Sequence, residues 1–253
     1  MGLAGQADPL GAPALAFRRL IRLNPLSHFD IQVINLPSRA DRREDFGREL
    51  AAVGMSYADV RLFSAVRPDD ANGFPSIGTL GCFLSHLGAL RAAEPGRPVL
   101  ICEDDLNFSR DFLPRIGTIV ERLRRDEWGV FYGGHDTFGE PVRDMEPFPS
   151  DKGIRFAHMI GFNADVVPRV IAYLEAILAR GGGDPAGGPM HVDGAYSWFR
   201  RDYPDIVTRL ALPQLGFQRR SRTDVHDHRW HDRTPVIAQA MTLARRLRNR
   251  LYR

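Results

Sequence analysis

Three consecutive acids at the end of an apolar run carry the clearest chemical signal in the chain. Glu103, Asp104 and Asp105 directly follow the residues VLIC. In parallel α/β sheets, ligands bind at the carboxyl ends of strands, and adjacent carboxylates repel one another unless a cation lies among them. Carboxylate oxygens at this density suit Mg²⁺ or Mn²⁺, ions that also bind substrate phosphates. The other interpretation is an acidic cap on a helix that begins after Asp105.

An arginine-rich segment, INLPSRADRRED at residues 34–45, gives the second signal. We expect its strand to lead through a short turn, carrying Arg39, Arg42 and Arg43, into the N-terminus of a helix. Helix N-terminal amides and guanidinium forks both bind phosphate oxygens, so this arrangement would form an anion site. The alternative is a solvated helix face with ion pairs between neighbouring turns.

A third segment, GCFLSH at residues 81–86, places His86 among apolar neighbours on a predicted helix, which is typical of a core histidine. Ser85 is adjacent to His86, so the two side chains point in different directions and do not form a nucleophile pair. The two cysteines, Cys82 and Cys102, form neither a CxxC motif nor a Cys/His metal pattern. Two separate buried thiols favour a reducing compartment.

Strands and helices alternate through most of the chain, which predicts an α/β fold with a mostly parallel central sheet and helices on both faces. The expected strands are residues 29–36, 56–66, 97–105, 128–134 and 155–162. The expected helices are residues 38–54 (capped near Ser38 and ended by Gly54), 79–93, 116–125 and 166–183, with a further helix start in HVDGAY. These elements must position the acids and arginines.

The chain divides into three parts. We expect a flexible arm at residues 1–27, a single domain at 28–233, and an amphipathic helix at 234–253 whose leucines form one stripe beside several arginines. Such a helix suits the anionic surface of a membrane. Alternatively, the leucine stripe packs on the domain core and leaves the arginines in solvent.

Composition sets outer bounds on these interpretations. The chain has 253 residues, of which 43% are hydrophobic and 26% charged, and this excludes collagen-like, coiled-coil and wholly disordered classes. No 18-residue apolar run occurs and residues 1–16 lack a signal-peptide pattern, so we expect a cytoplasmic protein. The net charge of +3 (34 − 31) is carried almost wholly by arginine, which favours anionic partners or reflects an arginine-biased genome. The sequence has no stripe in which aromatic and basic residues alternate, so it does not predict binding of nucleic acid.

Together these motifs resemble glycosyltransferase family 25, the lipooligosaccharide-biosynthesis type of glycosyltransferase. INLPSRADRR, then GCFLSH, then VLICEDD occur in the family's order, and the resemblance is dense over residues 31–112. Beyond these residues it is thinner, with FAHMIGFNADVVPRVI and HVDGAYSWF at the corresponding places. The sequence departs from the family at His158, where relatives often carry an aromatic residue, and in the Gly-rich insertion at 181–188. Both departures concern the acceptor.

The resemblance implies a single Rossmann-like domain of the GT-A type that uses a nucleotide-diphosphate sugar, with a UDP-hexose such as UDP-galactose favoured. It implies that the acids at 103–105 hold Mn²⁺ or Mg²⁺ against the diphosphate, with Asp105 as the direct ligand and Glu103 beside it. The donor-side residues that it implies are Asn35, Arg39, Asp41, Arg42, Arg43, Ser85, His86, Glu103 and Asp104.

Further candidates follow from the chemistry of such a transfer, which needs a base for the acceptor hydroxyl. Asp193, in HVDGAY, is the candidate base, or else a helix N-cap. His226 and His228, with Asp227 between them, could complete the metal site or form a polar loop. His135 and the Asp that follows it could contact the acceptor or form a turn.

The sequence therefore predicts a metal-dependent, inverting hexosyltransferase acting on a saccharide or lipid-linked glycan, in lipopolysaccharide biosynthesis, with peripheral contact to the inner face of the cytoplasmic membrane. Two other functions stay open. One is a Mg²⁺-dependent phosphohydrolase or nuclease, which would need additional carboxylates such as Asp136 and Asp193. The other is a nucleotide-binding module without catalysis.

Overall fold

The computed structural model describes residue 24 and residues 26–219 of the chain. The expected N-terminal arm at 1–27 therefore falls almost wholly outside the described residues. The expected C-terminal helix at 234–253 lies outside them entirely, as does the stretch that contains His226, Asp227 and His228.

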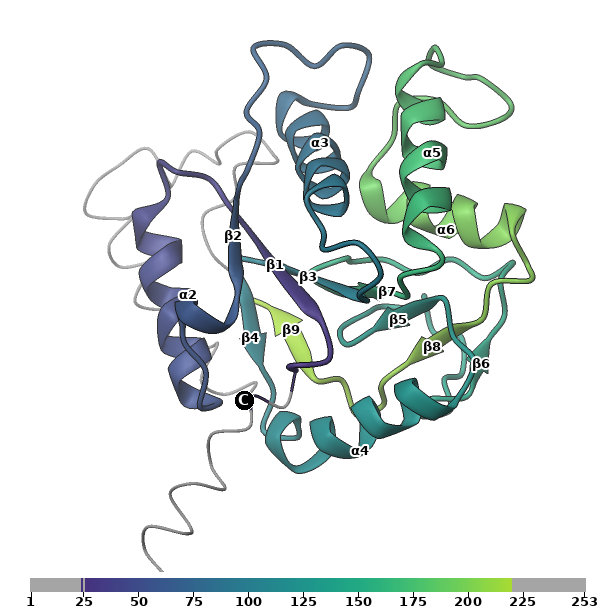
Figure 1. Cartoon of the computed structure of the whole chain (residues 1–253). Helices are drawn as coiled ribbons and strands as arrows, with labels where there is room; N and C mark the ends of the chain where they lie inside the picture. Colours follow the sequence, from purple (N-terminus) through teal and green to yellow (C-terminus); the bar gives the residue numbers. More distant parts are fainter. Residues whose placement is uncertain (1–23, 25, 220–253) are drawn as a thin grey trace, which may run out of the picture.

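A seven-stranded sheet forms the centre of the molecule (Figure 1), in the order β2-β1-β3-β7-β5-β8-β6. The strands are β1 (Asp30–Asn35), β2 (Arg61–Ser64), β3 (Val99–Glu103), β5 (Val130–Tyr132), β6 (Pro147–Phe148), β7 (Met159–Phe162) and β8 (Thr208–Leu210). Strand β1 pairs in parallel with both β2 and β3, and β5 pairs in parallel with β8. Strand β7 runs antiparallel between β3 and β5, and β6 runs antiparallel to β8. Five of the seven strands (β1, β2, β3, β5 and β8) therefore run in the same direction, and only β6 and β7 oppose them. In this sense the sheet is mostly parallel, as expected.

Helices cover both faces of this sheet, which confirms the predicted α/β class (Figure 1). Helices α2 (Ala40–Ala52) and α4 (Phe112–Arg125) pack on one face. Helices α3 (Ile77–Arg91), α5 (Val167–Leu178) and α6 (Val192–Asp202) pack on the other. A short 3₁₀ turn, η1 (Tyr57–Asp59), precedes β2.

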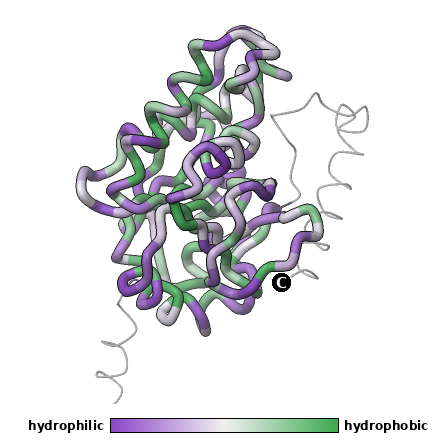
Figure 2. The backbone as a smooth tube through the Cα atoms, turned by 90° about the vertical axis from the view of Figure 1, so that its right-hand side faces the viewer, coloured by the Kyte–Doolittle hydropathy of each residue, from purple (hydrophilic) through white to green (hydrophobic). Residues whose placement is uncertain are grey.

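Alternation along the strands divides the hydrophobic core between the two faces. In β3, Val99 and Ile101 join the cluster under α3, α5 and α6, whereas Leu100 and Cys102 join the cluster under α2 and α4. Successive strand side chains point to opposite faces, so a continuous apolar run is what a strand covered on both sides requires. In Figure 2, hydrophobic residues lie in the middle of the molecule and also alternate with hydrophilic residues along the helices.

The structure decides three helix caps that the sequence raised. Asp105 does not cap a helix, because the strand β4 (Leu106–Phe108) follows it and pairs antiparallel with β9 (Gly216–Gln218). The N-cap of α2 is Arg39, one residue after Ser38, which confirms a cap near Ser38. The N-cap of α6 is His191, so Asp193 lies within the first turn of that helix.

Candidate functional site

The polar site lies where the parallel strands β1 and β3 end side by side. Ile34 is in register with Glu103, so Asn35 at the end of β1 is brought next to the acids that follow β3. Two cavities meet there, with volumes of about 550 Å³ and about 1240 Å³. Arg42, Cys82 and Glu103 line both cavities and therefore form their shared wall.

The smaller cavity lies between the end of β1, the segment before α3 and the first turns of α3. Its wall includes Leu36, Val66, Arg67, Ser76, Ile77 and Gly78. Ser76 is the N-cap of α3, and its side chain accepts a hydrogen bond from the amide of Thr79 at 3.0 Å. The positive end of the α3 dipole thus faces the same cavity as the guanidinium of Arg42, and both favour an anion.

Asp104 is held from two sides. Its Oδ2 accepts a hydrogen bond from Asn35 Nδ2 at 2.7 Å, and its Oδ1 accepts one from Arg42 Nη1 at 2.9 Å. Burial raises the pKa of Asp104, although the charge of Arg42 opposes the shift. Because both carboxylate oxygens already have partners, Asp104 fixes Arg42 and the end of β1 in place.

Asp105 is held less completely. Its Oδ2 lies 3.5 Å from Arg42 Nη1 and 3.4 Å from Gln218 Nε2, whereas its Oδ1 is buried without a hydrogen-bond partner among the described residues. Burial, followed by the negative charge of Glu103, raises the pKa of Asp105 to about 7. A buried carboxylate oxygen with no partner is costly, so this arrangement favours a cation at Asp105.

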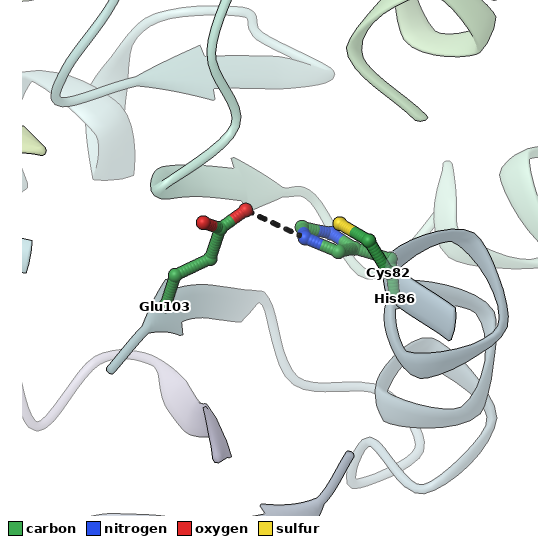
Figure 3. A group of neighbouring side chains, drawn as sticks. All are labelled: Cys82, His86 and Glu103. Carbon is green, nitrogen blue, oxygen red and sulfur yellow. Dashed lines mark hydrogen bonds and ion pairs between the residues drawn. The ribbon is translucent and has the colours of Figure 1, made fainter. Parts of the chain in front are cut away.

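Glu103 faces helix α3 instead (Figure 3). Its Oε1 lies 3.3 Å from Nε2 of His86, and Nδ1 of His86 lies 3.1 Å from the hydroxyl of Tyr196 on α6. Burial alone would raise the pKa of Glu103, but the hydrogen bond and charge of His86 and the charges of His158 and Arg42 more than offset this and lower it. Glu103 is therefore held in its ionised form.

Cys82 completes a group that the sequence analysis missed. One ligand atom from each of Cys82, His86 and Glu103 lies within 4.8 Å of the other two (Figure 3). The statement that the cysteines form no Cys/His pattern is thus wrong, because Cys82 and His86 are four residues apart and share one face of α3. That spacing was the available signal. In the part of the chain that the structure describes, Asp105 does not belong to such a group.

Arg219 is another residue of the site that was missed. Its backbone amide donates to the carbonyl oxygen of Asp105 at 2.6 Å, and its guanidinium donates to the carbonyl oxygen of Asp104 at 3.0 Å. The same guanidinium lies 3.0 Å from Asp45 of α2. Arg219 directly follows β9, so the pairing of β4 with β9 places it here, and no local pattern in the sequence indicated this.

The expected donor-side arginines separate in the structure. Arg42 lines both cavities. The next residue, Arg43, donates a hydrogen bond to Asn35 Oδ1 at 3.0 Å. Arg39 instead pairs with Asp41 at 2.9 Å, where Asp41 is 66% exposed. The hydrogen bond from Arg39 lowers the pKa of Asp41 to about 2. Arg39 and Asp41 are not among the residues that line either cavity.

Ser85 joins α3 to the segment that follows β2. Its hydroxyl donates to the carbonyl oxygen of Gly81 at 2.6 Å and accepts from the amide of Val66 at 2.8 Å. Ser85 also contributes to the wall of the smaller cavity. Its bonds to the backbone show that it holds this wall in shape.

The close approach at Gly81 gives a stability prediction. A Cβ at Gly81 would lie 2.6 Å from the carbonyl oxygen of Val66. Because this oxygen belongs to the backbone, the clash can be relieved only by a shift of the segment around Val66, which forms part of the cavity wall. We expect Gly81→Ala to lower the free energy of unfolding by about 1–3 kcal/mol. Gly117→Ala is the matched control, because Gly117 lies inside α4 with nothing within 4 Å of its Cβ, and should gain about 0.5–1 kcal/mol. Equal urea-unfolding midpoints for the two variants would contradict this account.

The larger cavity collects residues from the second half of the chain. Asp193, His135 and His158 line it together with the first turn of α6. Asp193 is half-buried, and its Oδ2 accepts a hydrogen bond from the amide of Phe156 at 3.1 Å. His158 is buried, and burial lowers its pKa. Asp136 pairs with Arg155 and is not among the cavity residues.

The fold and the site together define an α/β protein whose polar groups gather at the carboxyl ends of parallel strands, the usual place for ligands in such sheets. The chain is 26% identical over 123 residues to a protein of Acanthamoeba polyphaga mimivirus that is named as a glycosyltransferase. The match covers 43% of this chain and 38% of the length of that protein. No protein-family model matches the chain.

Among solved structures, the chain has a distant likeness to a protein of Bacillus anthracis named as a glucose-1-phosphate thymidylyltransferase, in complex with sucrose. The two share 15% identity over 90% of this chain and 81% of the other, with a TM-score of 0.38. Within residues 24 and 26–219, no helix is long and apolar enough to cross a membrane.

Proposed function

We propose that this protein transfers a hexosyl group from a nucleotide-diphosphate sugar to a saccharide or lipid-linked glycan. The observation that carries the proposal is the pair of cavities that share Arg42 and Glu103 as a wall, at the strand ends where the acids gather. Two adjoining cavities with a charged boundary can hold a donor and an acceptor side by side, which group transfer between two bound molecules needs. The partial similarity to a protein named as a glycosyltransferase supports the same reaction class.

The donor occupies the smaller cavity in this proposal. Its volume of about 550 Å³ is in the usual range for a small-molecule site. Arg42 and the N-terminus of α3 attract the diphosphate from two sides, and Arg67 adds a third positive group to the wall. We take UDP-galactose as the favoured donor, on the resemblance of the motifs to family 25.

A divalent cation fits at Asp105. The unpartnered, buried Oδ1 and the pKa of about 7 describe a carboxylate that lacks a positive neighbour on one side. Asp105 is the proposed direct ligand for Mn²⁺ or Mg²⁺, with Glu103 near it and with His226 and His228 as proposed ligands from outside the described residues. Asp105 lines the larger cavity, which shares Arg42 and Glu103 with the smaller one, so an ion held there would lie near the boundary and would supply charge neutralisation for the departing diphosphate.

The acceptor occupies the larger cavity, and Asp193 is the proposed base. As an acceptor hydroxyl oxygen attacks the anomeric carbon, Asp193 takes its proton, and the bond from that carbon to the diphosphate oxygen breaks with its electrons. The new bond forms on the opposite face of the sugar, so the configuration inverts. Arg42, between the cavities, stabilises the negative charge that develops on the diphosphate.

Hydrolysis of phosphate esters is the less favoured alternative. A two-metal site needs several carboxylates around one space. Asp104 already has partners on both oxygens, and Asp136 pairs with Arg155 and is not itself among the residues that line the cavities.

Product release tests the proposal. A panel of nucleotide-diphosphate sugars is incubated with the full chain, Mn²⁺ and mixed saccharide acceptors, and free nucleoside diphosphate is measured. We expect release from one UDP-hexose that depends on acceptor and stops when EDTA removes the ion. Release of inorganic phosphate from nucleotides without any acceptor would instead assign the site to a phosphohydrolase.

A further inference from the structure

We propose a second cation site, specific for a thiolate-binding ion such as Zn²⁺, formed by Cys82, His86 and Glu103 at the boundary between the two cavities. The inference concerns binding and does not depend on which reaction the protein catalyses. It is distinct from the proposed Mn²⁺ or Mg²⁺ position at Asp105, which lies outside this group of ligand atoms.

The spacing of the ligand atoms supports this site. Cys82 and His86 project from successive turns of α3, and Glu103 approaches them from the end of β3 (Figure 3). All three atoms lie within 4.8 Å of one another, and the nitrogen and oxygen are already 3.3 Å apart. Tetrahedral zinc with bonds of about 2.0–2.3 Å separates its ligand atoms by roughly 3.5 Å. Small side-chain rotations of Cys82 therefore suffice.

The orientation of His86 is also fixed in the required way. Its side chain is fully buried, and Nδ1 lies 3.1 Å from the hydroxyl of Tyr196, which is likewise buried. Without an ion, Nε2–H donates to the ionised Glu103. Binding an ion at Nε2 requires the other tautomer, in which Nδ1–H donates to the Tyr196 hydroxyl and the Nε2 lone pair faces the ion. Histidines that bind metals through one nitrogen use the other in this manner. Tyr196 is thus a positioning residue for the site.

The ligand set selects the ion. Sulfur and imidazole ligands favour Zn²⁺ over Mg²⁺ or Mn²⁺, whereas Asp105 offers only oxygen. Without an ion, burial raises the pKa of the Cys82 thiol well above its usual value. Binding forms a sulfur–metal bond and releases the thiol proton to solvent, so one proton leaves for each ion bound. Because Cys82 and Glu103 line both cavities, the fourth ligand position opens toward them and takes water.

Cobalt spectroscopy on the full chain tests the site. After treatment with EDTA, the protein is titrated with Co²⁺, and thiolate-to-cobalt charge transfer is recorded in the near ultraviolet. We expect this band in the unmodified protein and in Cys102→Ser, and its loss in Cys82→Ser. Cys102 is the matched control, since it is the other free cysteine among the described residues and is buried in the opposite core cluster. Zn²⁺ should displace Co²⁺ and bind Cys82→Ser at least 10-fold more weakly.

Absence of the band in the unmodified protein, or its persistence in Cys82→Ser, would overturn the proposal. A second measurement needs no variant and so does not depend on folding of Cys82→Ser. Maleimide labelling of the unmodified chain, followed by peptide mass spectrometry, should show Zn²⁺ slowing modification of Cys82 at least 10-fold. Mg²⁺ should have no such effect, and equal protection by both ions, or protection by neither, would contradict a thiolate site.

Discussion

Asp105→Asn is expected to reduce glycosyl transfer on the order of 100-fold and to remove the Mn²⁺-supported part of UDP affinity. An amide oxygen is a poorer ligand than a carboxylate for a hard dication, and the substitution keeps the size of the side chain. Calorimetry of UDP with and without Mn²⁺ measures the effect directly. Asp205→Asn is the control, because neither Asp205 nor its partner Arg169 is among the residues that line the cavities. Equal metal-supported affinity in the Asp105 variant would remove this residue from the site.

The same variant should be more stable than the unmodified protein when no divalent ion is present. The pKa of Asp105 is raised from 3.8 to about 7, so the folded state disfavours its ionisation. Stability contributed by the neutral carboxyl is present below about pH 4 and is lost as pH rises to about 7. Asn cannot ionise, so the substitution should raise the free energy of unfolding by roughly 2–4 kcal/mol at pH 8. At pH 4 this increase should nearly vanish. Thermal melts at both pH values, with EDTA, check this difference.

Arg42→Met is expected to lower the free energy of unfolding by about 3–5 kcal/mol, the largest loss of stability foreseen for this chain. The Arg42 side chain is 13% exposed, and those of Asp104 and Asp105 are 8% and 9% exposed, so removal of the guanidinium leaves two buried carboxylates without their cation. Urea unfolding at pH 8 measures the loss. Arg48→Met, which breaks ion pairs on the exposed face of α2, should cost less than about 1 kcal/mol.

Arg42→Lys separates the two roles of this residue. Lysine keeps the charge but cannot bind two oxygens with a planar fork, so the donor KM should rise about 10-fold while much of the stability returns. An unchanged KM would leave Arg42 with a structural role alone. For the stability prediction, unfolding of Arg42→Met at the same urea concentration as Arg48→Met would contradict the role of Arg42 as the cation between Asp104 and Asp105.

The local patterns predicted the elements that bear the site, and for physical reasons. The apolar run before Glu103 is what a strand covered on both faces requires, and the apolar spacing of α3 fits a helix. A parallel arrangement of β1 and β3 then brings Asn35 and Arg42 to Asp104. The elements that carry these groups were therefore predicted, whereas the contacts of Asn35 and Arg42 with Asp104 are given by the strand pairing in the structure.

Contacts between distant segments could not be predicted in this way. Periodicity does not give strand direction, so the antiparallel placement of β7 was not foreseen. Strands of three residues such as β4 and β9 show too few alternations to be recognised, and their partners are more than a hundred residues apart. His86 and Tyr196 are 110 positions apart in the sequence, so local patterns could not show that Tyr196 orients the histidine that lies beside Cys82 and Glu103.

The pairing of β4 with β9 also sets the time at which the acids acquire their surroundings during synthesis. The guanidinium of Arg219 bonds to the carbonyl oxygen of Asp104 across 115 positions of sequence. At a ribosomal rate of about 5–20 residues per second, the acids wait on the order of ten seconds before β9 emerges. Through that interval their carboxylates stay hydrated, and the edge of β4 is open to other strands. Completion of the site is thus a late event in the life of the nascent chain.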